Sequence, residues 1–248
     1  MPPASHRFER VLPLPGAALI INLHEDETRV YADDEARTCT RSAAAILGGP
    51  LLRSQIIDTA EQIRVMGVVF RPGGAHAFTS EDLSRCAGQD IDLHDLFGAA
   101  SGRLRQRLLN THAPPERLRL LECWLKQRLQ PGAIDPAIAH AVNLLQAVPQ
   151  VHRLPLIART IGLSERRFTQ LFRRQLGMTP KQYARLLRFR AVIDHAHARS
   201  RVDWSAVAAD CGYCDQAHLG HEFRQFAGIT PTAFMQQRGP HINHLPLA

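Results

Sequence analysis

Residues 157–183 have the sequence IARTIGLSERRFTQLFRRQLGMTPKQY, and residues 207–234 repeat its pattern as VAADCGYCDQAHLGHEFRQFAGITPTAF. The Ala and Gly near the start of the two copies match at an offset of 50. The Phe, Gly and Thr-Pro near the end match at an offset of 51, so the second copy has one additional residue in its turn. Agreement at so many special positions indicates that both segments form the same supersecondary unit.

Each copy has the pattern of a helix-turn-helix. In the first copy, Ala158 is small enough for a second helix to approach, Gly162 ends the first helix in a tight turn, and Ser164 caps the next helix. The apolar stripe of that next helix comprises Phe168, Leu171, Phe172 and Gln175 or Leu176. The corresponding residues of the second copy are Ala208, Gly212 and Asp215, followed by the inward-facing Leu219, Phe223 and Phe226.

The two units are joined by a helical segment. A Thr-Pro pair follows each unit, at residues 179–180 and 230–231, and supplies a cap and a Pro at the first helical position. Residues 181–198 then have the pattern of one continuous helix, which would hold the two units rigidly apart. We expect this helix to add positive charge through Arg185, Arg188 and Arg190.

The positive charge of the chain lies in the half that holds the repeat. The formal net charge is +7, and residues 1–132 contain equal numbers of basic and acidic side chains, so residues 133–248 carry the whole excess. This asymmetry predicts a polyanionic partner for the C-terminal half, most simply double-stranded DNA. A basic surface that only keeps the protein soluble is the alternative.

Residues 133–238 resemble the DNA-binding region of the AraC/XylS family of bacterial transcription regulators. The most specific motifs are Ala158-x3-Gly162, Phe172-x4-Gly177-x-Thr179-Pro180, Gly212-Tyr213-x-Asp215-Gln216-x-His218 and Phe223-x4-Gly228-x-Thr230-Pro231. The resemblance implies that two recognition helices enter successive major grooves on one face of DNA. It implies base-contacting positions at Arg166, Thr169 and Gln170 in the first helix and at Gln216, Ala217, His218, Gly220 and His221 in the second.

The chemistry of the first recognition helix agrees with this assignment. The Gln170 amide can form two hydrogen bonds with adenine, and the Arg166 guanidinium can form two with guanine. Contacts with phosphates supply affinity without sequence preference. We expect such contacts from Ser164, Arg167, Arg173, Arg174, Lys181 and Arg224.

The second recognition helix has fewer long polar side chains. Ala217 and Gly220 cannot form side-chain hydrogen bonds with bases, and His221 stands where the family often has Arg. We expect this helix to recognise a thymine methyl group, the backbone position or the shape of the DNA instead. Alternatively, Gln216 and His218 have a structural role or face phosphates.

The N-terminal part has the pattern of a β sandwich or barrel. Ala18–Leu23 and Ile63–Phe70 are short runs rich in branched apolar residues, and Gly- and Pro-containing turns separate them. The segment FRPGGAHAF, Phe70–Phe78, is similar to a subgroup of the same family and to the PG-x-x-H-x-F turn of cupin-like sensor domains. That similarity implies a domain that binds a small effector or mediates dimerisation.

From about residue 92 the apolar period changes to that of helices. One helix is indicated by Leu104, Leu108 and Leu109, and a second by Leu118, Leu121, Trp124 or Leu125, and Leu129. We expect a helical hairpin that packs on the β domain or pairs with a second copy of the chain.

The sequence supports other kinds of functional site less well. Cys211-x2-Cys214-x3-His218-x2-His221 has zinc-like spacing, but the gap between the pairs is short and Cys211 suits a buried small apolar position. His76 could be a cupin metal ligand, but the strand-rich part offers few other histidines to complete such a site. We therefore expect no metal and no cofactor. Five cysteines are few and odd in number, so we expect no disulfide framework. Residues 1–90 contain only Cys39 and Cys86, which are too few for the four-cysteine zinc centre of an alkyl-acceptor domain. No hydrolase, Walker or Rossmann motif is present, so we expect no enzyme.

We therefore predict an α+β protein that regulates transcription by binding DNA. Its expected parts are a β-rich, cupin-like sensor domain (1–90), a helical hairpin (91–132), an all-α domain with two helix-turn-helix units (133–238) and a tail (239–248). Candidate partners besides DNA are a small-molecule effector, RNA polymerase and a second copy. A ligand-independent regulator and a cupin-type metalloenzyme fused to a DNA-binding region are the alternatives. No run reaches the roughly 18 apolar residues of a membrane span, so we expect a cytoplasmic protein.

Overall fold

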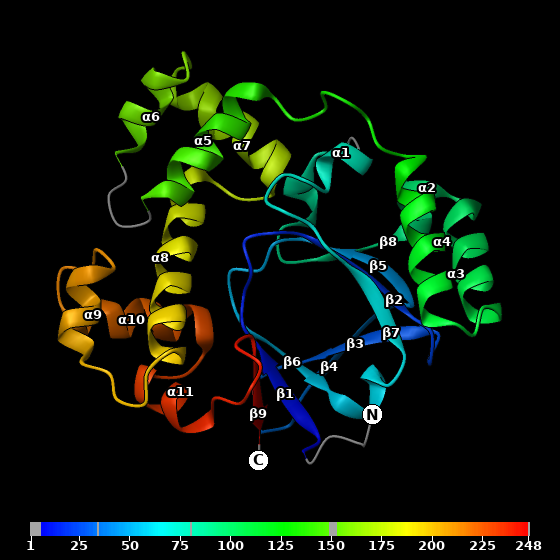
Figure 1. Cartoon of the computed structure of the whole chain (residues 1–248), viewed down its shortest axis with the longest axis horizontal. Coiled ribbons are helices and arrows are strands. Elements are labelled where there is room, and N and C mark those ends of the chain that lie inside the picture. The colour runs from blue at the N-terminus through cyan, green and yellow to red at the C-terminus, as the bar shows by residue number, and fades with distance from the viewer. Residues whose placement is uncertain (1–5, 34, 80, 149–152, 248) are drawn as a thin grey trace.

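The computed structural model describes residues 6–33, 35–79, 81–148 and 153–247 (Figure 1). The first part of the chain is rich in short strands that alternate buried and half-exposed residues, as in β2. The strands are β1 (Phe8–Val11), β2 (Ala18–Asn22), β3 (Glu27–Tyr31), β4 (Cys39–Ala43), β5 (Ala45–Gly48), β6 (Gln55–Asp58), β7 (Val65–Val69) and β8 (Asp90–Asp92). Three short helices lie between them: η1 (Thr59–Gln62), α1 (His76–Thr79) and η2 (Leu83–Cys86).

The strands form two antiparallel sheets. One has the order β4-β3-β6-β1-β9, where β9 comprises His244–Leu247, and the other has the order β7-β2-β5-β8. The central strand β2 pairs with β5 and with β7, so the apolar run that was recognised in the sequence lies at the middle of the second sheet. The prediction of a β-rich N-terminal domain is confirmed.

The final strand of the first sheet comes from the C-terminal end of the described chain. Strand β9 (His244–Leu247) pairs with β1 in antiparallel register, with Leu245 opposite Arg10. The sequence predicts only a tail over residues 239–248 and gives no sign of this strand. Pairing with β1 places these four residues in a sheet whose other members precede them by more than 180 positions, which local sequence patterns do not reveal.

A helical hairpin covers the second sheet. After α2 (Leu93–Phe97), helices α3 (Ala99–Asn110) and α4 (Pro114–Lys126) lie side by side at the edge of the molecule (Figure 1). Their buried residues join Leu19 and Ile21 of β2 in one core that includes Leu104, Leu108, Leu121, Trp124 and Leu125. Leu118 and Leu129, which we expected in the apolar stripe, are 61% and 48% exposed, so the stripe is narrower than predicted.

The rest of the chain is helical and forms the second domain. Its helices are α5 (Pro136–Ala147), α6 (Leu154–Thr160), α7 (Glu165–Leu176), α8 (Pro180–His197), α9 (Trp204–Asp210), α10 (Gln216–Ala227) and α11 (Pro231–Gln237). The pairs α6–α7 and α9–α10 are the two predicted helix-turn-helix units, and α8 is the predicted joining helix (Figure 1). Within the described ranges, no helix is both long enough and apolar enough to cross a lipid bilayer.

One continuous core holds the two units on α8. Tyr183, near the start of α8, is fully buried beside Phe172 of the first unit, with ring centroids 5.5 Å apart. Phe189, further along α8, contacts Phe223 and Phe226 of the second unit at 5.2 and 5.0 Å. Because buried aromatic side chains dominate such cores, α8 fixes both recognition helices to one rigid body.

Candidate nucleic-acid interface

Local sequence signals define the first recognition helix, α7. The Ser164 hydroxyl accepts a hydrogen bond from the backbone N–H of Arg167 at 3.3 Å and so caps the start of the helix. Gly177 ends the helix with φ of +79°, a conformation that glycine adopts without strain. Thr179 then forms a capping box with Gln182 at the start of α8, where Lys181 is exposed.

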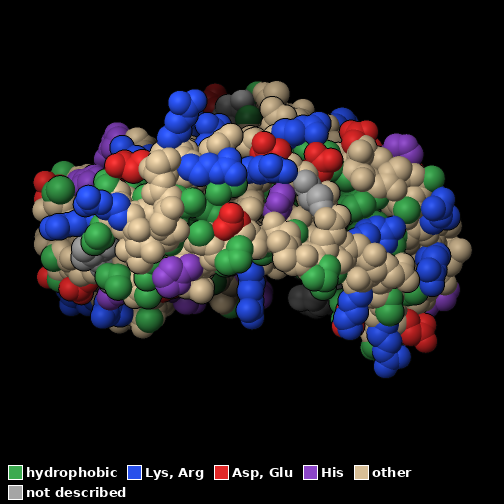
Figure 2. All heavy atoms as spheres, turned by 90° about the horizontal axis from the view of Figure 1, so that it is seen from above, with side chains coloured by type: hydrophobic (Ala, Val, Ile, Leu, Met, Phe, Trp, Pro, Cys, Tyr) green, Lys and Arg blue, Asp and Glu red, His purple; other side chains and the backbone are tan. Residues whose placement is uncertain are grey.

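The outward face of α7 carries the predicted DNA-contacting side chains. Thr169 is half-buried, and the others are exposed: Arg166, Arg167, Gln170, Arg173 and Arg174. The Arg167 guanidinium donates to the Gln170 amide oxygen at 3.1 Å, so both side chains lie along the same face. In the view from above, Lys and Arg side chains are spread over the surface and carboxylates are fewer (Figure 2).

A groove of about 630 Å³ lies between this face and the N-terminal domain. Asp82 and Ser84, at the start of η2, form its other wall opposite Arg173 and Arg174. Burial raises the pKa of Asp82, but hydrogen bonds from Ser84 and the charge of Arg174 outweigh burial, and the pKa lies below its usual value. The N-terminal domain therefore borders the surface of the first recognition helix.

The second recognition helix, α10, places a less polar face outward. Ala217, His221 and Arg224 are exposed, and Gly220 is half-buried. The exposed Gln216 accepts a hydrogen bond from the Ser205 hydroxyl at 3.2 Å.

His218, also on α10, packs on a neighbouring tyrosine. Its ring lies 5.3 Å from that of Tyr213, and its Nδ1 accepts the Cys214 N–H at 3.4 Å. These contacts hold the turn before α10, which favours the structural interpretation of His218.

Two of the α8 arginines from which we expected added positive charge are paired within the domain. The Arg185 guanidinium lies 2.5 Å and that of Arg188 3.4 Å from the carboxylate of Glu222, which is buried on α10. Burial lowers the pKa of Arg190. Arg185 and Arg188 therefore fasten α10 to α8, because an unpaired buried Glu222 would be costly.

The N-terminal domain also contacts the C-terminal end of α10. The Ser54 backbone N–H donates to the Phe226 carbonyl at 2.7 Å, and the Ser54 hydroxyl donates to the Ala227 carbonyl at 3.0 Å. Arg10, only 4% exposed, donates to the Ser54 hydroxyl at 3.1 Å. Sequence analysis missed these residues, because no local pattern marks partners that are more than 170 positions apart.

No cluster of three or more His, Cys, Asp or Glu side chains suited to a metal ion is found within the described ranges. Cys211 is buried and Cys214 is exposed. His76 is buried, and its Nδ1 lies 2.8 Å from the Glu81 carbonyl.

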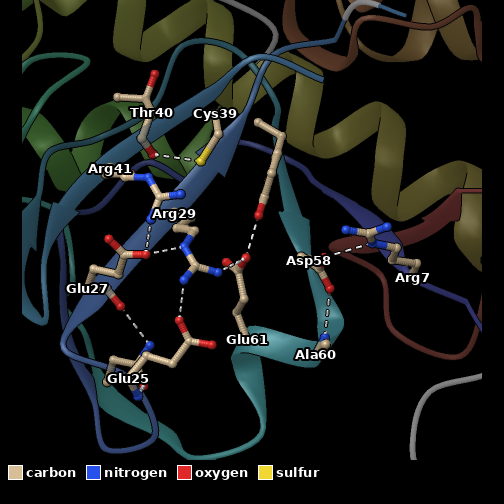
Figure 3. Close-up of polar contacts among 12 residues, drawn as sticks. Arg7, Glu25, Glu27, Arg29, Cys39, Thr40, Arg41, Asp58, Ala60 and Glu61 are labelled. Carbon is tan, nitrogen blue, oxygen red and sulfur yellow. Dashed lines mark hydrogen bonds and ion pairs between the residues drawn. The ribbon is translucent and has the colours of Figure 1, made fainter. Parts of the chain in front are cut away.

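The carboxylates of Glu25, Glu27 and Glu61 surround the guanidinium of Arg29, which pairs with all three (Figure 3). Hydrogen bonds from Arg41 and then Arg29 lower the pKa of Glu27. Two guanidinium groups, those of Arg29 and Arg41, thus pair with the three carboxylates of this cluster.

Comparison with known proteins agrees with this geometry. Residues 157–237 match the family model of a helix-turn-helix domain, and residues 2–92 match a domain of unknown function, DUF6597. The chain is 38% identical over 122 residues to the HTH-type transcriptional activator RhaR of Cronobacter sakazakii and 29% identical over 118 residues to the HTH-type transcriptional regulator ArgR of Pseudomonas aeruginosa. Each match covers 46% of this chain, but only 42% and 34% of those relatives.

Two solved structures are similar to this chain, one over less than half of its length and the other over most of it. An AraC-type regulator from Chromobacterium violaceum is 27% identical, with a TM-score of 0.38, over 42% of this chain and 96% of its own. ToxT from Vibrio cholerae with a bound unsaturated fatty acid is 9% identical, with a TM-score of 0.47, over 93% of this chain and 91% of its own.

Two helix-turn-helix units on one joining helix, each with an exposed recognition face, define a domain of the paired helix-turn-helix class. The repeat motifs and the matched relatives make the assignment more specific. Residues 157–237 form a helix-turn-helix domain that is similar to that of the transcriptional activator RhaR.

Proposed function

We propose that the protein regulates transcription by binding a specific DNA site with α7 and α10. The observation that carries the proposal is the exposed, arginine-rich outer face of α7 on a rigid core that also holds α10. Recognition helices in successive major grooves lie about 34 Å apart, so the site would extend over about 20 base pairs. A chromosomal DNA target would place this action in the cytoplasm.

The proposed base contacts are unequal between the two helices. Arg166, Thr169 and Gln170 of α7 supply hydrogen bonds to base edges. The outer residues of α10 supply mostly shape and methyl contacts, through Ala217 and Gly220, together with His221. The half of the DNA site that α7 contacts should therefore show the stronger sequence preference.

In-vitro selection from a random DNA pool with the full-length protein tests this function. One asymmetric motif of about 20 base pairs is expected if both helices recognise sequence. A motif of about half that length would assign sequence recognition to α7 and a clamping role to α10. Binding without any enriched sequence would contradict specific regulation.

Gln170→Ala should weaken binding to the selected site by about 1–3 kcal/mol and relax the preference at one or two positions, because the amide pairs with a base edge. The change is measured by fluorescence anisotropy on the selected duplex and on duplexes with each position altered. An unchanged preference would show that the orientation assigned to α7 is wrong.

Arg173→Ala should weaken binding to all sequences alike and reduce the dependence of affinity on salt, because its guanidinium is assigned to a phosphate. Titrations of selected and unrelated duplexes over a range of salt concentrations measure both effects. A loss confined to the selected site would instead place Arg173 among the base contacts.

The N-terminal domain would control DNA binding, through a small effector or dimerisation that changes how the two domains are arranged. Its contacts beside α7 and at the end of α10 support this proposal, because any shift of the domain alters both surfaces. RhaR is a transcriptional activator and the ToxT structure holds an unsaturated fatty acid, so activation and an apolar acid effector are the first cases to test.

A further inference from the structure

A small hollow lies where the N-terminal domain meets α10. Its volume is about 370 Å³, and we call it the interdomain hollow; it is lined by Asp33, Arg53, Ser54, His221, Arg224, Gln225 and Gly228. Arg224 is among the phosphate contacts expected from the sequence, whereas Arg53 comes from the other domain. The hollow therefore joins a surface of the DNA-binding domain to a surface of the sensor domain.

The side chains that line the interdomain hollow have a net positive charge. Asp33 is its acidic member, and that carboxylate is paired with Arg10 at 2.7 Å and Arg37 at 3.1 Å. Arg53 and Arg224 are exposed, and no hydrogen bond or ion pair engages either guanidinium within the described part of the chain. Two unpaired guanidinium groups beside a neutralised carboxylate form a site that suits an anion with several oxygens, such as a phosphate.

The position of Arg53 is fixed through its neighbour. Ser54 forms two hydrogen bonds with the last carbonyls of α10, and buried Arg10 supports its hydroxyl. The backbone at position 53 therefore cannot move away from α10 unless these contacts break.

The outer face of α10 gives a reason for an additional backbone contact. With Ala217 and Gly220 on that face, this helix makes few hydrogen bonds to bases, so its affinity must come largely from phosphates. We infer that Arg53 and Arg224 together bind a DNA phosphate beside the groove that α10 enters, so that the sensor domain forms part of the DNA interface. This inference rests on the proposed function.

The inference links DNA affinity to the arrangement of the two domains. When the domains move apart, Arg53 leaves the DNA while Arg224 stays. The alternative role for Arg53 is to complement the partial negative charge at the C-terminal end of α10, which would stabilise the fold without touching DNA.

The test compares full-length wild-type protein with Arg53→Gln and with Arg119→Gln. Arg119 is an exposed residue of α4 whose guanidinium has no ion pair among the residues that the structure describes. Binding to a random-sequence duplex of about 30 base pairs is measured over a series of salt concentrations. Arg53→Gln should reduce the slope of log affinity against log salt by about 0.9, as expected for one lost phosphate contact, and should lower affinity about three- to tenfold at low salt. Arg119→Gln should leave the slope unchanged.

Thermal unfolding and a shortened duplex separate the outcomes. An unchanged melting temperature of Arg53→Gln together with a reduced salt slope supports the phosphate contact. On a duplex that holds only the half-site of α7, wild type and Arg53→Gln should have the same salt slope, which would also support it. A lower melting temperature with an unchanged slope would overturn the inference and assign Arg53 to the helix end. If the wild-type protein itself binds no duplex, the proposed function fails as well.

Discussion

Replacing Phe189 with alanine is expected to lower the free energy of unfolding by about 3–5 kcal/mol, which is the usual cost of removing a fully buried phenyl ring. Phe189 is completely buried in α8, and its ring packs against Phe223 and Phe226 of the second unit. The cavity would lie between the joining helix and α10. Denaturant unfolding followed by circular dichroism measures the loss.

The matched control is Phe189→Leu, which keeps most of the volume and should cost less than about 1.5 kcal/mol. Because α10 loses its support in the alanine variant, binding to the full site should fall toward that of α7 alone. A loss below about 1 kcal/mol for the alanine variant would contradict the role of Phe189 as the contact that fixes α10.

The second large effect is expected for Gly177→Ala, at the end of the first recognition helix. Gly177 has φ of +79°, and a Cβ there would lie 2.9 Å from the Leu83 carbonyl oxygen and 3.0 Å from the ring of Pro50. Both the backbone strain and the clash with the N-terminal domain oppose the alanine, so we expect a loss of about 3 kcal/mol in unfolding free energy.

Gly162→Ala separates the two causes. Gly162 has a similar φ of +71°, but a Cβ at this position would meet nothing within 4 Å. This variant should lose only about 1 kcal/mol, from backbone strain alone. The difference between the variants measures the contact between α7 and the N-terminal domain, and equal losses in both would show that this contact is easily adjusted.

The sequence predicts the DNA-binding domain well because its signals are local. Each recognition helix has a cap, an apolar stripe and a terminal glycine within about fifteen residues, and the repeat doubles every signal. Ser164, Gly177 and Thr179 perform in the structure the capping and turn functions that their positions predict. The β-rich character of the first domain also follows from short apolar runs between turns.

The features that the sequence does not predict depend on distant partners. Ser54 and Arg10 lie beside the second helix-turn-helix unit only because the first sheet packs against the end of α10. The sequence shows the positive charge of Arg185 and Arg188, but it does not show that both lie beside the buried carboxylate of Glu222. Leu118 fits a helical stripe, yet it is exposed because the sheet lies against the other side of α4.

Strand β9 changes how the two domains are connected. Because β9 pairs with β1, the DNA-binding domain is an insertion within the N-terminal fold, attached to it both by the segment before α5 and by the segment after α11. A domain attached at one point can swivel, whereas attachment at two points leaves a hinge about the line that joins them. Any larger excursion requires β9 to separate from β1, so the ladder between these two strands limits how far the two domains can separate.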